Sequence, residues 1–200
     1  VSTVQMEYFC HKKPAGILEL VSNQVSACAA LCPEVEFVAV DFGRSEGEFL
    51  MQAIKAAVDS GASIVTVSDV AGTLLPDEFF AEIKRIKDAL PENVKLGVYC
   101  SNDLFLADAC AIAAVRAGAD EIKTIAFGPS TVSLDKFPFI LNQKSDVCGA
   151  ECCVRLTELR QVVGQIHNLC EACISKAPTA VNVQDHERDS IIITNNDNMT

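Results

Sequence analysis

The sequence has few basic residues for its length and no long apolar run. Its 200 residues hold 16 Lys and Arg against 27 Asp and Glu, which gives a net charge of −11. This acidic excess argues against binding to nucleic acid or to an anionic membrane surface. Because there is neither an apolar run of about 20 residues nor a basic-then-apolar start, we expect no membrane span, no secretion signal and a cytoplasmic protein.

The rest of the composition is that of a soluble globular domain with a substantial core. Half of the residues are hydrophobic, 22% are charged, and ten are cysteines. With ample apolar residues for a core, the cysteines are interpreted as small hydrophobic residues in a reducing compartment. An alternative for the C-terminal group is a zinc or iron–sulfur site, since Cys-x2-Cys is a ligand spacing as well as one face of a helix. That group comprises Cys148, Cys152, Cys153, His167, Cys170 and Cys173.

Strand and helix patterns alternate along the chain. The segments SGASIVTVSD (60–69) and AGADEIKTIA (117–126) both end a helix with Gly-Ala and enter a strand, as repeated βα units do. Such units form parallel strands with right-handed crossovers. The patterns predict strands at 35–40, 64–67, 94–101 and 121–127, a strand fragment at 2–8, and helices at 48–60, 76–90, 104–117 and 151–176.

This order predicts an α/β fold with parallel βα repeats, either a small open sheet or half of a (β/α)8 barrel, which needs eight strands and about 250 residues when closed. We divide the chain into a partial barrel (1–145), a C-terminal helical segment (146–177) and a polar tail (178–200). The tail is expected to be mostly disordered, with Ile191–Ile193 as its apolar spot.

Four segments carry a resemblance to a known family, namely MEYFCHKKPAGILEL, VEFVAVDFGRSEGEFL, ASIVTVSDVAGTLLPDEF and VYCSNDLFLADACAIAAVRAGADEI. Together they resemble the C-terminal half of the catalytic barrel of 2-isopropylmalate synthases, homocitrate synthases and hydroxymethylglutaryl-CoA lyases. The resemblance covers about residues 5 to 140 and is specific in order and spacing. It implies a partial (β/α)8 barrel.

The resemblance also implies what this chain has changed. The family carries His-x-His for a divalent metal at the end of its seventh strand, where this sequence has Tyr99 and Ser101. The family's Asn ligand falls on Phe127, and its Asp ligand belongs to a first strand outside these 200 residues. A phenol, a hydroxyl and a phenyl ring are poor replacements. We therefore expect no metal, no cofactor and no acyl-CoA condensation by this chain alone.

Three side chains at the ends of predicted strands are candidate catalytic or binding residues. Asp41 and Arg44 belong to the family's acidic-x-x-Arg-Ser/Thr loop, and Asp69 ends the strand at 64–67. They are either polar lining kept from a substrate pocket or, for the two aspartates, caps that bind nearby backbone amides.

Lys123 is a further candidate because it shares strand parity with Ile125 and Phe127, on the expected interior side. The segment GADEIKT also resembles the Schiff-base lysine strand of deoxyribose-phosphate-type aldolases. A buried lysine has a lowered pKa and becomes nucleophilic. The alternative is a structural lysine near the strand's start.

These observations leave several functions open. The first is an inactive relative of the synthases that binds a small organic acid or a partner chain. The others are a subunit of an active acyltransferase completed by a separate N-terminal half, a Schiff-base aldolase, and a fragment without function.

Four parallel strands would leave open edges near 35–40 and 121–127. We place Phe37, Val65, Val67, Ile125 and Phe127 on the inward face. An apolar inward face predicts a homodimer or a complementary half-barrel chain, unless the helix at 151–176 covers it.

Overall fold

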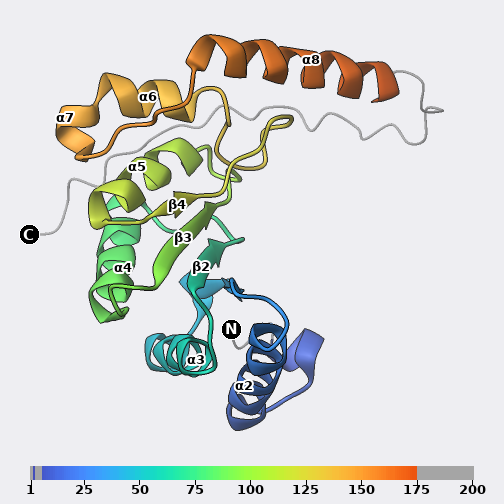
Figure 1. The fold of residues 1–200 in the computed structure, drawn as a ribbon, viewed down its shortest axis with the longest axis vertical. Coiled ribbons are helices and arrows are strands. Elements are labelled where there is room, and N and C mark those ends of the chain that lie inside the picture. Colours follow the sequence, from blue (N-terminus) through green and yellow to red (C-terminus); the bar gives the residue numbers. More distant parts are fainter. Residues whose placement is uncertain (1, 3–5, 175–200) are drawn as a thin grey trace, which may run out of the picture.

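Four parallel strands form one open sheet in the order in which they occur in the sequence, β1-β2-β3-β4 (Figure 1). The computed structural model describes residue 2 and residues 6–174. The parallel order confirms the predicted partial (β/α)8 barrel. The strands are β1 (Glu36–Val40), β2 (Ile64–Asp69), β3 (Lys95–Cys100) and β4 (Glu121–Ile122).

Helices connect the strands and begin and end within three residues of the predicted bounds. Gly61 and Gly118 end two of these helices with φ of 108° and 99°, a left-handed backbone that glycine adopts without strain. The repeated Gly-Ala signal therefore marks the two equivalent turns. The helices are α3 (Gly47–Asp59), α4 (Pro76–Ala89) and α5 (Ala107–Ala117), preceded by α2 (Pro14–Ala29), which packs on α3.

The main core lies between the sheet and these helices. Val65 and Val67 of β2 have no exposed surface and pack in one cluster with Leu96 and Val98 of β3 and with helical side chains such as Phe79. Phe37 lies against the same cluster. The prediction that Phe37, Val65 and Val67 face inward is wrong. Successive strand residues point to opposite faces of a sheet, and these three lie on the face that the helices cover.

The opposite face, which would line a closed barrel, is more polar. It carries Glu36, Thr66, Gly97 and Tyr99 at alternating positions of β1, β2 and β3. Val38 also lies on this face and is 45% exposed. The apolar residues of this face in the strands are thus few, namely Val38 and Val40 of β1 and the half-buried Ile64 of β2. The inward face is therefore not wholly apolar.

Strand β4 is shorter than the predicted 121–127 because the following residues pair with one another. Ile125 donates its N–H to Val132 at 2.9 Å and accepts one from Leu134 at 2.9 Å. This local ladder takes the place of further pairing with β3, so Ile125 and Phe127 lie beyond the strand.

Two other boundaries differ from the prediction for local reasons. Helix α5 begins at Ala107 because Phe105 has a left-handed backbone, with φ of 60°, and the Asn102 side chain accepts the Ala107 N–H at 3.2 Å. The predicted strand fragment at 2–8 is wrong where it is described, since η1 (Met6–Cys10) is a short π-helix.

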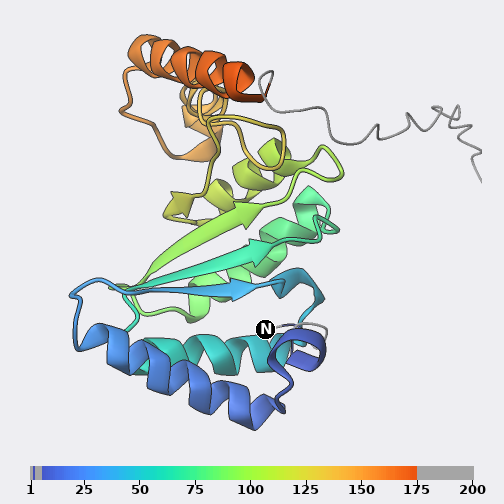
Figure 2. The ribbon, with the colours of Figure 1, turned by 90° about the vertical axis from the view of Figure 1, so that its right-hand side faces the viewer.

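The C-terminal segment forms three helices beyond β4, and α8 is the outermost of them in both views (Figures 1 and 2). The predicted helix at 151–176 begins later, at Leu156. The Asn142 side chain binds both the N–H and the carbonyl of Cys152, at 2.8 and 3.1 Å, and holds this residue outside the helix. The expected tail at 178–200 lies outside the described residues. The helices are α6 (Phe137–Gln143), α7 (Ser145–Cys148) and α8 (Leu156–Ile174).

Helix α8 does not lie over β1 to β3 (Figure 2). It therefore does not cover the inner face of these strands, which was the predicted alternative to association with a second chain. Across the described residues, no helix is both long enough and apolar enough to span a membrane.

Candidate functional site

Asp41 and Arg44 form an ion pair directly after β1, with the carboxylate buried and the guanidinium half exposed. Asp41 has no exposed surface and a left-handed backbone with φ of 64°, and Arg44 lies in η2 (Phe42–Arg44). The Arg44 Nε and Nη2 atoms donate to the two carboxylate oxygens at 2.8 and 2.9 Å. Ser2 donates its hydroxyl to the same carboxylate. Burial alone would raise the pKa of Asp41, but the bonds from Arg44 and Ser2 outweigh it and lower that pKa.

Asp69 is the last residue of β2, and its pKa is shifted in the opposite direction to that of Asp41. It is 2% exposed, and its Oδ1 accepts the Gly72 N–H at 3.0 Å. Burial raises its pKa above the ordinary value, the charge of Asp41 adds to the rise, and backbone hydrogen bonds only partly oppose it. Two neighbouring carboxyl groups with pKa values pushed apart resemble an acid–base pair in enzymes.

The Arg44 guanidinium is the accessible part of this group. Its side chain is 46% exposed, whereas that of Asp41 is fully buried. A guanidinium has five N–H donors in a planar fork, and Asp41 engages only its Nε and Nη2. The buried carboxylate therefore fixes a cation that can offer further donors to a carboxylate ligand at the strand ends.

Tyr99 lies on the inner face of β3, and Ser101 follows directly after the last residue of that strand. The loop at 129–133 docks on this strand end. Ser101 forms an isolated bridge with Thr131, whose hydroxyl donates to the Cys100 carbonyl at 2.6 Å. The Ser101 Oγ accepts the Asp103 N–H at 3.4 Å, so this hydroxyl takes part in the local turn.

Phe127 lies in a different environment from the two positions on β3. Its ring packs edge-on against the His167 imidazole of α8, with ring centroids 5.0 Å apart. An edge-to-face aromatic contact of this kind stabilises packing. The residue at 127 therefore helps to seat α8.

Lys123 lies away from Asp41, Arg44 and Asp69. Its Nζ reaches back to Glu36, at the start of β1, at 2.7 Å and contacts Glu121 at 3.3 Å. Partial burial would lower its pKa, but the hydrogen bonds and charges of Glu36 and Glu121 raise it instead. The lowered pKa that the Schiff-base interpretation requires is thus not found, because Glu36 and Glu121 stabilise the ammonium.

The cysteines do not form a metal centre in the described part of the chain. Within residue 2 and residues 6–174, no three His, Cys, Asp or Glu side chains gather as metal ligands would. Of the C-terminal group, Cys148 is buried, whereas Cys153 and Cys173 are exposed. Near the strand ends, burial raises the pKa of Cys110 to about 11, which keeps its thiol protonated and unreactive.

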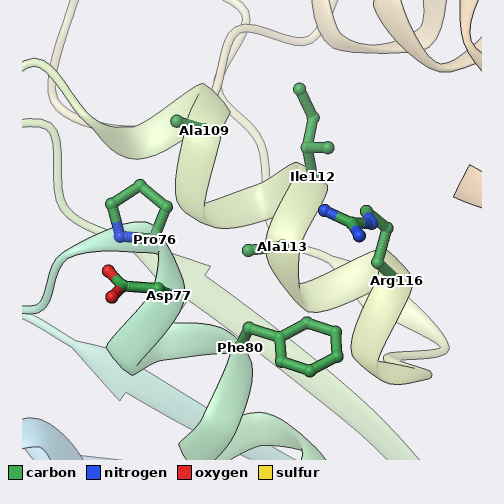
Figure 3. A pocket seen from close by; sticks show the side chains of 7 residues that line it. All are labelled: Pro76, Asp77, Phe80, Ala109, Ile112, Ala113 and Arg116. Atoms are coloured by element: carbon green, nitrogen blue, oxygen red, sulfur yellow. The ribbon is translucent and has the colours of Figure 1, made fainter. Parts of the chain in front are cut away.

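A groove of about 400 Å3 lies on the outer layer, between α4 and α5 (Figure 3). Asp77 of α4 and Arg116 of α5 are its charged residues, and the Arg116 guanidinium lies 5.9 Å from the Phe80 ring centroid. None of the candidate residues from the sequence lines this groove.

Two side chains that decide how the candidates behave are not signalled by the sequence. Ser2 binds Asp41 from 39 residues away, and no short-range pattern indicates that contact. Glu36 neutralises Lys123 across the sheet. The strand register aligns Glu36 with Ile64 and Lys95, so it does not by itself indicate this second pair.

Known proteins resemble this chain over most of its length. A family model described as HMGL-like matches residues 1–129. The 2-isopropylmalate synthase of Pyrococcus furiosus is 29% identical over 194 residues, which are 93% of this chain and 39% of that protein. The one from Aquifex aeolicus is 32% identical over 154 residues, 74% of this chain and 30% of that protein. The chain thus spans two fifths or less of these relatives.

Solved structures share the fold at low sequence identity. HMG-CoA lyase from Bacillus subtilis superposes with a TM-score of 0.67 and 13% identity, covering 86% of this chain and 61% of that one. The carboxyl transferase domain of Rhizobium etli pyruvate carboxylase gives a TM-score of 0.55 and 20% identity, covering 71% and 25%. These likenesses describe a partial TIM-barrel fold.

Proposed function

Because the chain belongs to the HMGL-like family, we propose that it is a non-condensing member that binds a small organic acid at the carboxyl ends of its strands. Its family relatives are 2-isopropylmalate synthases. The proposal is that the metal-dependent half of their chemistry is lost here, while the anchored arginine remains as an anion-binding group.

The observation that carries the proposal is the pair of side chains at the end of β3. Tyr99 and Ser101 occupy the two places where the family resemblance implies imidazole ligands, Tyr99 within β3 and Ser101 directly after its last residue. Neutral phenol and serine hydroxyl groups are weak ligands for a divalent ion, and Phe127 has no ligand atom. The residues present therefore do not fit the metal, and we assign no step to one.

Arg44 supports the binding half of the proposal. Its guanidinium is held in place by the buried Asp41 carboxylate and is itself half exposed. A pre-positioned guanidinium recognises a carboxylate with little further loss of side-chain entropy. Asp69 ends the neighbouring strand β2, where burial raises its pKa above the ordinary value.

We do not propose the Schiff-base aldolase. An imine forms from a neutral amine, and the two carboxylates beside Lys123 favour the charged ammonium.

A second candidate function is that of a half-barrel completed by another polypeptide with HMGL-like βα units. Val38 and Val40, on the inner side of the edge strand β1, are 45% and 37% exposed. An apolar edge of this kind suits the addition of a strand. Co-expression with such a chain should give a complex that Val38→Lys disrupts and that Val70→Lys, at a site that is 38% exposed, retains. Equal retention by both variants would contradict it.

The test of the main proposal restores the metal ligands. We expect the wild-type chain to show no stoichiometric binding of Mn²⁺ or Zn²⁺ and no thiol release from acetyl-CoA with any of a panel of 2-oxo acids. The double variant Tyr99→His, Ser101→His should gain divalent-metal binding, measured by equilibrium dialysis, because two imidazoles then share one strand face.

The control is Tyr99→His with Ser101 unchanged, which supplies one imidazole and should bind at least about tenfold more weakly. For the organic acid, oxaloacetate and 2-oxoisovalerate serve as probes in calorimetry, with Arg44→Met as the variant expected to lose binding. Metal binding by the wild-type chain, or metal-dependent thiol release, would overturn the proposal.

A further inference from the structure

Helix α8 presents two adjacent apolar seams, of which only one packs against other described residues. The first seam packs toward the rest of the molecule, with Val163 buried to 3% exposure. The second contains Val162 and Leu169, which are 52% and 67% exposed. The two seams share Leu159 and Ile166, which are half-buried.

The spacing of the second seam is that of a helix–helix contact. Leu159, Val162, Ile166, Leu169 and Cys173 follow one another at intervals of three, four, three and four residues. This is the a/d pattern that packs against another helix, whereas a strand partner would require a period of two. Because α8 is the outermost helix beyond β4, a second helix can reach this seam (Figures 1 and 2).

The seam is complementary to itself in the antiparallel direction. With a two-fold axis near Gly164, Leu159 lies opposite Leu169 of the second copy, and Val162 lies opposite Ile166. Each of the resulting four layers then joins two large apolar side chains.

The charges along α8 favour the same direction. Arg155, just before α8, and Arg160, near its start, are basic, and Glu158 between them pairs with Arg155. Glu171, near the described end of the helix, is acidic. An antiparallel pair places the basic start of one copy beside the acidic end of the other, and a parallel pair would align like charges. The helix dipoles are also opposed in the antiparallel pair.

We propose that the second seam of α8 is a self-association surface on which α8 of a second copy packs antiparallel. The pairing is independent of the organic-acid site and of the β1 edge. Glu158 and Gln165 flank the seam and leave its centre apolar. Clusters of large apolar side chains at the centre of an interface carry most of its binding energy.

The experiment compares charges placed on the seam with the same charges placed one residue earlier. Sedimentation equilibrium of the full chain should show a dimer. The double variant Val162→Glu, Leu169→Glu should raise the dimer dissociation constant at least about 100-fold. The matched control Gln161→Glu, Asn168→Glu adds equal charge on an exposed face of the same helix and should leave the constant within about threefold.

The circular dichroism spectrum of the double variant shows whether α8 persists, and Val38→Lys separates the β1 edge from α8. The proposal requires that Val38→Lys remain dimeric. A monomeric wild-type chain, a dimer unaffected by the seam charges, or a dimer lost equally in the control would overturn it. A monomer that dimerises only after removal of residues 175–200 would also overturn it, since that segment would then cover the seam.

Discussion

The two ends of the inner sheet face hold charged clusters of different character. At the carboxyl ends, Asp41 is buried completely and fixes a half-exposed Arg44. At the opposite end, Glu36 and Lys123 are each about one-third exposed and neutralise each other. The first cluster holds a cation ready for a ligand, and the second satisfies its own charges. In (β/α)8 barrels, chemistry is found at the carboxyl ends and stability at the other.

Replacing Asp41 should have the largest effect on this comparison. Asp41→Ala removes a buried acceptor of three hydrogen bonds and places alanine in a left-handed backbone. We expect a loss of about 3 kcal/mol in the free energy of unfolding, from the lost bonds and the backbone strain. Urea denaturation followed by circular dichroism measures it.

The matched variant is Asp59→Ala, which removes an exposed ion pair with Lys55 and should cost no more than about 0.5 kcal/mol. Equal losses for the two variants would remove the distinction between a buried anchoring carboxylate and a surface charge.

Gly97, between the two clusters, should be the next most sensitive position. A Cβ at Gly97 would overlap the Thr66 hydroxyl and approach the Lys123 side chain to 3.5 Å. Gly97→Ala should therefore cost about 2 kcal/mol through overpacking. The loss should shrink in the background of Thr66→Ala, and additive losses in this double-mutant cycle would refute the steric explanation.

The order of the strands and helices was predictable from the sequence, whereas the face of the sheet that packs on the helices was not. Repeated Gly-Ala turns and alternating periodicities predicted four parallel βα units. The inner face was assigned wrongly because Phe37, Val65 and Val67 look like an interior surface in a strand taken alone. Only the apolar faces of α3, α4 and α5, which must pack on something, show that this parity faces the helices.

Part of the site was also accessible from the sequence. Strand ends meet at one edge of a parallel sheet, which brings Asp41, Arg44 and Asp69 together. The hydrogen bond from Ser2 and the Phe127–His167 contact join segments about 40 residues apart. No periodicity reports contacts of this kind, so the environments that shift the pKa values could not be derived.

The reactivity of Lys123 gives a smaller test of the self-neutralised cluster. Glu36 and Glu121 raise the pKa of this ammonium, so its neutral amine is scarce at pH 7. Reductive methylation with formaldehyde and cyanoborohydride should label Lys123 at least about threefold more slowly than the exposed Lys136, as read by peptide mass spectrometry. Preferential labelling of Lys123 would instead revive the Schiff-base interpretation.

The smallest expected effect separates the two aspartates by the sign of their pH dependence. The folded-state pKa of Asp41 is lowered from 3.8, so its stabilising contribution is present above pH 3.8 and is lost as the pH falls through the folded-state pKa. The folded-state pKa of Asp69 is raised from 3.8, so its contribution is present below pH 3.8 and is lost as the pH rises through the folded-state pKa.

Asp41→Asn should therefore make stability fall less steeply on acidification, whereas Asp69→Asn should make it fall more steeply. Denaturation midpoints between pH 3 and pH 7 measure both slopes, and each variant is the control for the other. Slopes that change in the same direction would mean that the two carboxyl groups do not differ in the way that their surroundings require.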